Sequence, residues 1–244
     1  MNPIILIPAR LGSTRLPGKI LADIAGLPMI VHVLNRAREA NLGPVAVACG
    51  EAEIAEAVRA AGGIAVLTDP ALPSGSDRIH AALLELDPEG AHDVIINLQG
   101  DLPTIGADVL AQVLLPLHEG FDIATLVAPV TTAAEAEAPS VVKCVCAFAE
   151  GAHVAPALYF SRNAVPSGDG PLWHHIGIYA YRRDALSRFV SLPESPLERR
   201  EKLEQLRGLE AGMRIGAARV AHAPFGVDTP ADLEHARNIL GAAR

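Results

Sequence analysis

Short apolar runs alternate with amphipathic stretches through the first half of the chain. Apolar runs of this length favour buried strands, which we expect at residues 4–7, 45–49, 64–67, 94–98 and 123–127. Between them, apolar side chains recur with helical spacing, which predicts helices at residues 30–40, 52–61, 77–86 and 107–117. This alternation predicts an α/β fold with a mainly parallel sheet flanked by helices.

The pattern changes near Ala138, where strands follow one another without full helices between them. We expect strands at residues 141–148, 157–160 and 176–181, which together form a small antiparallel insertion at about residues 139–182. The insertion is a candidate dimer interface within a single domain, residues 1–244. Helices at 195–211 and 230–240 and a strand at 215–221 are expected to complete the fold.

Bulk composition narrows the functional classes. The net charge of −8 argues against general nucleic-acid binding, which favours a basic surface. No apolar run approaches the ~18 residues of a membrane span, and no signal peptide is evident, so we expect a cytoplasmic protein without membrane contact. Cys144 and Cys146 lack the spacing of a zinc site, and together with Cys49 they are expected to be buried thiols.

The segment after the first strand is unusually basic. Pro8 ends the strand, and the following loop carries Arg10, Arg15 and Lys19 among small residues. Small residues let backbone N–H groups approach an anion, and the three cations neutralise it. A loop of this kind at the carboxyl end of a strand predicts a polyphosphate site, with a solvated basic turn as the alternative.

Two common phosphate loops do not match this segment. The Walker motif has four residues between its glycines, whereas five residues separate Gly12 from Gly18. In addition, Ile20 follows Lys19 where the Walker motif has a hydroxyl residue. The glycine fingerprint of dinucleotide-binding folds is also missing from the loop, which makes a dehydrogenase remote.

Two aspartates stand where a metal could bind. Asp101 follows the expected strand at 94–98, with Gly100 directly before it and Pro103 two residues after it, and Asp228 lies just before a helix that starts at Thr229. Mg²⁺ prefers one or two carboxylates together with phosphate oxygens and water. Asp232, in the first helical turn, is expected to be a capping residue, and a turn-capping role is the alternative for Asp101.

Residues 6–19, LIPARLGSTRLPGK, resemble the signature of sugar cytidylyltransferases without a gap. SGSDR at 74–78, YFSR at 159–162, HHIGIY at 174–179, and the later SPLE, LEQLR and GVDTP elements are similar to the 3-deoxy-D-manno-octulosonate (Kdo) cytidylyltransferases, or CMP-Kdo synthetases. The resemblance implies a Rossmann-like nucleotide-diphospho-sugar transferase fold. It also implies an enzyme that converts CTP and Kdo to CMP-Kdo and pyrophosphate for lipopolysaccharide biosynthesis, acting as a homodimer.

The resemblance further implies roles for individual residues. The implied catalytic residues are Arg10, Arg15, Lys19 and Asp101, and the implied Mg²⁺ ligands are Asp101 and Asp228. The implied nucleotide-binding residues are Pro8, Ala9, Arg10, Ser13, Arg15, Lys19, Gly75, Ser76, Arg78 and Gln99. The implied sugar-binding residues are Arg162, His175, Tyr179, Glu204 and Gln205. From the residues alone, a strand histidine such as His175 is more often structural, and a solvated helix face is the usual explanation for Glu204 and Gln205.

Two positions depart from the family pattern. Many relatives carry Glu where this chain has Leu102, and Arg where it has His174. The alternatives to Kdo activation are CMP transfer to another 2-keto sugar acid, such as 8-amino-Kdo or a sialic-acid relative, and a catalytically silent nucleotide-binding homodimer.

Overall fold

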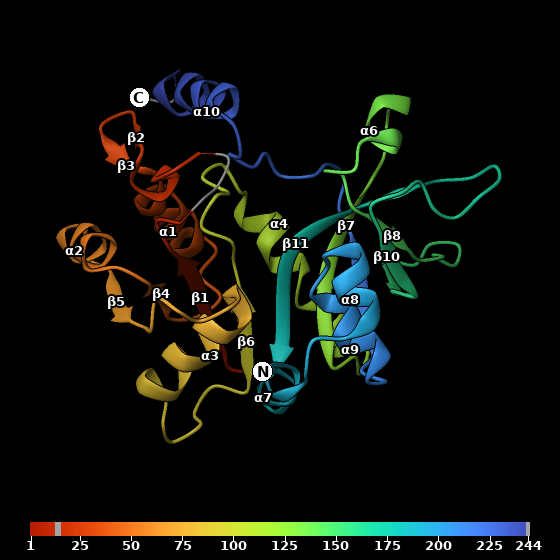
Figure 1. Cartoon of the computed structure of the whole chain (residues 1–244), viewed down its shortest axis with the longest axis horizontal. Helices are drawn as coiled ribbons and strands as arrows, with labels where there is room; N and C mark the ends of the chain where they lie inside the picture. The colour runs from red at the N-terminus through yellow and green to blue at the C-terminus, as the bar shows by residue number, and fades with distance from the viewer. Residues whose placement is uncertain (13–15, 243–244) are drawn as a thin grey trace. The chain divides into compact units, whose positions relative to one another are not determined.

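The computed structural model describes residues 1–12 and 16–242 (Figure 1). They divide into two compact units, the first comprising Met1–Leu110 and Pro224–Arg244 and the second Ala111–Ala223. The single domain with an insertion at 139–182 stays a prediction. No helix in the described residues is long and apolar enough to cross a membrane.

The first unit is built on a parallel sheet with the strand order β5-β4-β1-β6. The strands are β1 (Pro3–Ala9), β4 (Val45–Cys49), β5 (Ile64–Leu67) and β6 (Val94–Asn97). All residues of β4 and β6 are buried, as are Ile4–Ile7 of β1, which explains their unbroken apolar sequences. The strands predicted in this unit are therefore confirmed to within a few residues.

Three helices connect these strands: α1 (Met29–Glu39), α2 (Ala52–Ala60) and α3 (Gly75–Leu86). Right-handed crossovers place α1 and α2 on one face of the sheet and α3 on the other. Consistent with this, a Cβ on Gly63 would meet both Leu34 of α1 and Val58 of α2 at 2.7 Å. On α3, Ala82 and Leu86 pack with the strand residues Ala48 and Val66.

The last segment of the chain returns to this unit. Helix α10 (Pro230–Ala242) packs on the short strand β2 (Asp23–Ile24), which pairs with β3 (Leu27–Pro28), as Figure 1 shows. Arg237 of α10 donates a hydrogen bond to the Asp23 carbonyl at 2.9 Å. The unit also contains a 3-10 turn, η1 (Lys19–Leu21), and the start of α4 (Ala107–Gln112).

The second unit is a mixed sheet centred on β7 (Ile123–Pro129). Strand β7 pairs antiparallel with β11 (Trp173–Arg182) and parallel with β12 (Ile215–Arg219). Strand β12 pairs antiparallel with β9 (Val154–Pro156), and β8 (Lys143–Val145) pairs antiparallel with β10 (Tyr159–Ser161) and touches β11. Its helices are α5 (Leu115–His118), α6 (Ala133–Glu137), α7 (Arg183–Ser191), α8 (Pro196–Glu201) and α9 (Gln205–Glu210). The two units confirm the predicted fold class.

Two predicted helices are wrong in their extent. The helix expected at 107–117 is divided into α4 and α5, and Pro116, which lacks an N–H donor, lies in the first turn of α5. The helix expected at 195–211 is divided into α8 and α9, because Lys202 adopts a left-handed conformation with φ 57°. Glu201, Glu204 and Gln205 therefore do not share one continuous helix face.

In the second unit, the strands expected at 123–127 and 215–221 match β7 and β12 to within two residues, but three others were predicted with the wrong boundaries. Residues 141–148 form only the three-residue strand β8, and the strand expected at 157–160 is replaced by β9 and β10 on either side of Ala157 and Leu158. The expected strand at 176–181 is β11, which begins three residues earlier. Short strands carry few residues of alternating pattern, so their ends are poorly marked in the sequence.

A buried ion pair connects α8 to α9. Glu198 and Arg207 form two contacts, Oε1 to Nη2 at 2.5 Å and Oε2 to Nε at 2.8 Å. Glu198 also completes a capping box with Ser195, and the Arg207 guanidinium lies 5.5 Å from the centre of the Phe189 ring. The SPLE and LEQLR segments are thus held together by their own side chains.

Replacing Arg207 with Met should lower the free energy of unfolding by about 3 kcal/mol, since it leaves the Glu198 carboxylate buried and unpaired. Urea unfolding measures this change. Arg36→Met is the matched control because it removes an exposed ion pair, with side-chain exposures of 40% and 49% against 13% and 9% for the Arg207 pair. The control should change stability by less than about 1 kcal/mol. Equal losses in the two variants would contradict a buried pair.

Candidate functional site

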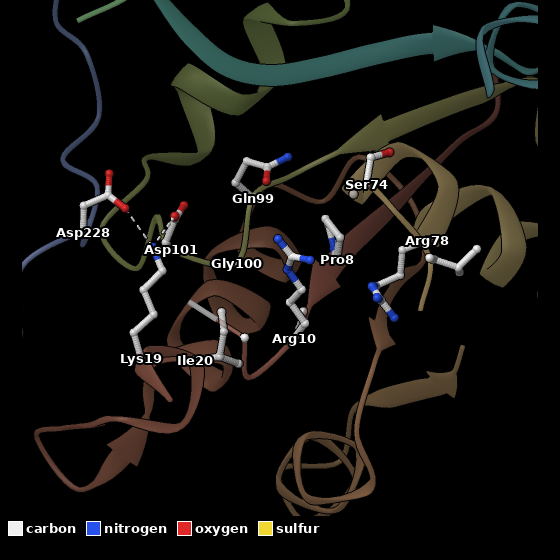
Figure 2. A pocket seen from close by; sticks show the side chains of 14 residues that line it. Pro8, Arg10, Lys19, Ile20, Ser74, Arg78, Gln99, Gly100, Asp101 and Asp228 are labelled. Carbon is white, nitrogen blue, oxygen red and sulfur yellow. Dashed lines mark hydrogen bonds and ion pairs between the residues drawn. The ribbon is translucent and has the colours of Figure 1, made fainter. Parts of the chain in front are cut away.

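The first unit contains a cavity of about 330 Å³ at the carboxyl ends of β1 and β6 (Figure 2). This is the edge at which ligands of parallel α/β sheets bind, and the volume suits a small molecule. Residues from five segments line the cavity: Pro8, Ala9, Arg10, Gly12, Lys19, Ile20, Leu72, Ser74, Gly75, Arg78, Gln99, Gly100, Asp101 and Asp228.

The loop that leaves β1 is anchored to its neighbours through the backbone. The Gly50 N–H donates to the Ala9 carbonyl at 2.8 Å, and the Leu11 N–H donates to Oε2 of Glu51 at 2.9 Å. Gly18 has φ 69°, a conformation that glycine adopts at little cost, and this turn leads directly into Lys19. Ser13 and Arg15 lie outside the described residues.

Lys19 is the centre of a polar cluster. Its Nζ donates to Asp101 Oδ2 at 2.8 Å, to Asp228 Oδ1 at 2.9 Å and to the Val227 carbonyl at 2.9 Å. Figure 2 shows the two carboxylates converging on the ammonium group. The three N–H donors of the ammonium match these three acceptors in number.

The two aspartates also raise the pKa of Lys19. Burial alone would lower this pKa, but the charge of Asp101 and hydrogen bonds to Asp101 and Asp228 outweigh that effect. Lys19 is therefore a firmly held cation at neutral pH. It occupies the position between two carboxylates that another cation would favour.

The backbone near both aspartates is fixed independently of Lys19. The Val227 N–H donates to the Asp101 carbonyl at 2.9 Å, which ties the two segments together. Asp232 accepts from the N–H groups of Asp228 and Thr229, and Thr229 caps α10 in return. The predicted capping role of Asp232 is confirmed, and Asp228 is left to face the cavity.

Arg10 and Arg78 bring two further positive charges to the cavity. A Cβ on Gly50 would lie 3.1 Å from Arg78 Nη1 and 3.4 Å from Arg10 Cβ, so glycine allows the two arginines to lie on either side of it. Burial lowers the pKa of Arg78, and the charge of Arg10 acts in the same direction. Arg78 donates to Thr68 Oγ1 at 2.6 Å and to the Asp69 carbonyl at 3.3 Å, which supports the loop before α3.

The start of α3 forms another wall of the cavity. Ser74 caps the helix, accepting from the Asp77 N–H at 3.1 Å and donating to the Asp77 carboxylate at 2.6 Å. A Cβ on Gly75 would lie 3.3 Å from Pro8 Cγ, so the helix end approaches the β1 loop closely. Ser76 is only 2% exposed and is not among the lining residues.

The five predicted sugar-binding residues all lie in the second unit. Arg162, just after β10, donates to the carbonyls of Pro139, Glu201 and Lys202 at 2.9–3.2 Å. Glu201, which is not among the predicted sugar-binding residues, accepts from Ser161 Oγ at 2.9 Å and from the Arg162 N–H at 3.1 Å. Much of the hydrogen-bonding capacity of Arg162 therefore fastens β10 to the end of α8.

His175 and Tyr179 stand side by side on β11, with ring centroids 5.5 Å apart. Burial raises the pKa of Tyr179, and the charge of nearby Glu204 adds to this effect. Gln205 is 6% exposed, and its Nε2 has no hydrogen-bond partner within the described residues. A buried amide without a partner is costly unless a ligand or water satisfies it.

The comparisons with known proteins place the chain in one family. The family model described as Cytidylyltransferase matches residues 4–215. A 3-deoxy-manno-octulosonate cytidylyltransferase from Rhodospirillum centenum is 60% identical, with 98% of this chain and 93% of that protein covered. A second, from Paramagnetospirillum magneticum, is 59% identical, with 99% of each chain covered. The chain belongs to the 3-deoxy-manno-octulosonate cytidylyltransferase family.

Solved structures support the same assignment. A CMP:2-keto-3-deoxy-manno-octonic acid synthetase complexed with CTP has a TM-score of 0.90 to this cytidylyltransferase, with 40% identity and full coverage of both chains. A nucleotidyl transferase from Methanothermobacter has a TM-score of 0.61 at 15% identity, which shows a shared fold alone. The predicted family and nucleotide-diphospho-sugar transferase fold are confirmed.

Most of the nucleotide-binding residues predicted for this cytidylyltransferase meet in one cavity. Those that line it are Pro8, Ala9, Arg10, Lys19, Gly75, Arg78 and Gln99, together with both aspartates. The lining residues absent from the prediction are Gly12, Ile20, Leu72, Ser74 and Gly100. Leu72 had no distinguishing signal in the sequence, and a Cβ built on Gly100 would lie 3.2 Å from the Pro8 carbonyl. The described residues hold no cluster of three or more His, Cys, Asp or Glu side chains suited to a metal. The individual roles of the site residues stay predictions.

The cytidylyltransferase should lose stability in acid partly through His175. Burial lowers the pKa of His175 to about 3, below the value near 6.5 of an unfolded histidine. The unfolded chain therefore takes up the proton first, and this contribution to stability is lost as the pH falls below about 6.5. Between pH 7 and pH 5, wild-type protein should lose about 2 kcal/mol more than His175→Gln in urea unfolding. His222→Gln, at an exposed position, should follow the wild type, and parallel curves for all three proteins would contradict a buried neutral His175.

Proposed function

We propose that this chain transfers CMP from CTP to Kdo, giving CMP-Kdo and pyrophosphate for lipopolysaccharide biosynthesis. The observation that carries the proposal is the cavity in which Lys19 holds Asp101 and Asp228 together, beside a basic loop at the end of β1. About 60% identity over nearly the whole length to proteins named for this reaction supports the same activity.

The two ends of the cavity present different side chains to a ligand. In Figure 2, Lys19 and the aspartates lie at one end, Ser74 and Arg78 at the other, and Arg10 between them. We assign the triphosphate to Arg10, Lys19 and Arg15, and the cytosine and ribose to Gly75, Arg78 and Gln99; the predicted Ser76 is buried outside the lining. Phosphoryl transfer depends mainly on positioning and on neutralising charge, which this arrangement supplies.

The donor set at Asp101 and Asp228 fits a Mg²⁺ ion. Both carboxylates already converge on one cation, the Lys19 ammonium, at 2.8 and 2.9 Å. Two carboxylates with open positions suit a metal that also contacts phosphate oxygens and water. When bound, Mg²⁺ supplies charge neutralisation and lowers the pKa of a hydroxyl in contact with it.

We assign the sugar acid to Arg162, His175, Tyr179, Glu204 and Gln205 in the second unit. The buried Gln205 Nε2 supports this assignment, since it has no partner among the residues that the structure describes and a ligand oxygen would satisfy it. The anomeric hydroxyl of the acid attacks the α-phosphorus in line, and pyrophosphate leaves as Arg10, Arg15 and Lys19 stabilise its charge. A cytoplasmic location and dimerisation through residues 139–182 stay predictions from the sequence.

A pyrophosphate-release assay tests the proposed reaction. The four nucleoside triphosphates are crossed with Kdo, 8-amino-Kdo and a sialic acid, and CTP with Kdo should give the fastest release. Asp101→Asn and Asp228→Asn should each lower the rate at least about a thousandfold while circular dichroism stays unchanged. Faster turnover of another acid would favour the alternative substrates. CTP binding without release from any acid would point to a silent nucleotide-binding protein.

Lys19→Met should strengthen metal binding in the absence of nucleotide. The ammonium competes with the metal for the same two carboxylates, so its removal should raise Mn²⁺ affinity about tenfold. Water-proton relaxation during a Mn²⁺ titration measures this directly, without turnover. Lys202→Met, at an exposed position in the other unit, controls for the change in net charge. Unchanged or weaker Mn²⁺ binding by Lys19→Met alone would contradict a metal site at these carboxylates.

A further inference from the structure

Strand β11 contains an irregularity beside two of the proposed sugar-binding residues. Ile176 is paired with Leu126 of β7, yet the next paired residue on β11 is Tyr179, opposite Thr125. Gly177 and Ile178 therefore have no opposite residue, as in an enlarged β-bulge.

The bulge brings His175 and Tyr179 together. Four residues of regular strand span about 13 Å, too far for two side chains on one face to stack. With two residues looped out, His175 and Tyr179 oppose Val127 and Thr125, and their ring centroids are 5.5 Å apart. The contact between these rings therefore depends on the bulge.

Thr125 holds the bulge from the opposite strand. Its side chain is fully buried, and its Oγ1 lies 3.1 Å from the Ile176 carbonyl and 2.9 Å from the Ile178 carbonyl. The same oxygen lies 3.0 Å from Nε2 of His175. The Thr125 hydroxyl thus contacts both ends of the bulge and the His175 ring.

The contacts of this hydroxyl also determine the tautomer of His175. A carbonyl can only accept, so the single hydroxyl hydrogen of Thr125 is directed to the carbonyls of Ile176 and Ile178. The His175 Nε2 must then donate to Thr125 Oγ1. Since His175 is neutral, with its pKa lowered by burial, its Nδ1 carries no hydrogen and is an acceptor.

We propose that Thr125 is a positioning residue for the sugar acid: its hydroxyl fixes the β11 bulge and the Nε2–H tautomer of His175, so that Nδ1 accepts a hydrogen bond from a hydroxyl of the acid. The proposal rests on the assignment of His175 and Tyr179 to the sugar acid made above. Thr125 acts through His175 and touches no substrate itself.

Steady-state kinetics with Thr125→Val and Thr125→Ser test this role. Valine keeps the shape of threonine and removes the hydroxyl, so the KM for Kdo should rise about tenfold or more, with the KM for CTP within about twofold. Serine keeps the hydroxyl and should restore the KM for Kdo. Thr132→Val is the matched control, because it removes an exposed threonine hydroxyl that only caps α6 in the same unit.

Long-range ¹H–¹⁵N spectra of the histidine rings provide a readout that does not depend on turnover. In the wild type at neutral pH, the His175 signal, assigned by its loss in His175→Gln, should show a hydrogen on Nε2. Thr125→Val should shift this signal toward the other tautomer, and Thr125→Ser should preserve it. A merely structural threonine would change stability without this selective change in the tautomer.

Several results would overturn the proposal. These are a hydrogen on Nδ1 of His175 in the wild type, an unchanged KM for Kdo in Thr125→Val, and an equal rise of the KM for Kdo in Thr125→Val and Thr125→Ser.

If Thr125→Val does not fold, Thr125→Cys takes its place, because its thiol is a weaker hydrogen-bonding group and should raise the KM for Kdo selectively. A wild-type KM in Thr125→Cys would then overturn it. Failure of the proposed function is distinguishable, since wild-type protein would then release no pyrophosphate from CTP and Kdo.

Discussion

The ammonium group of Lys19 joins three segments of the first unit that are far apart in the chain. Its partners, Asp101 and Asp228, lie 82 and 209 residues away in sequence, and the Val227 carbonyl completes the set. The loop after β1, the end of β6 and the segment before α10 therefore meet at one charged atom. Without this cation, two carboxylates would face each other in a partly buried cavity, where like charges repel strongly.

The rest of the cavity is arranged around charges that are not fully balanced within the chain. Arg10 and Arg78 lie on either side of Gly50, close enough for each charge to disfavour the other. Such an arrangement weakens the isolated protein slightly and favours an anionic ligand. Hydrogen bonds from the Gly50 and Leu11 N–H groups tie the first residues of the loop to the segment after β4.

The sequence predicts the first unit better than the second for a physical reason. Strand β4 matches its predicted bounds because buried parallel strands read as unbroken apolar runs between turns. In the second unit, the break between α8 and α9 depends on one left-handed residue, Lys202, at a position where a helix could otherwise continue. The bulge at Gly177 and Ile178 depends on the register with β7, which is a long-range property. Local pattern carries no signal for either feature.

Motif resemblance also does not distinguish residues that bind a ligand from residues that hold the site together. Glu198 and Arg207 belong to the family segments SPLE and LEQLR, yet both are occupied by their mutual ion pair. Gln205, within the same segment, retains a buried amide nitrogen without a partner in the described part of the chain. Because an unsatisfied buried donor is costly, it persists where a ligand can satisfy it. For Gln205 the unpaired donor therefore favours a ligand-binding role, and only the folded structure reveals it.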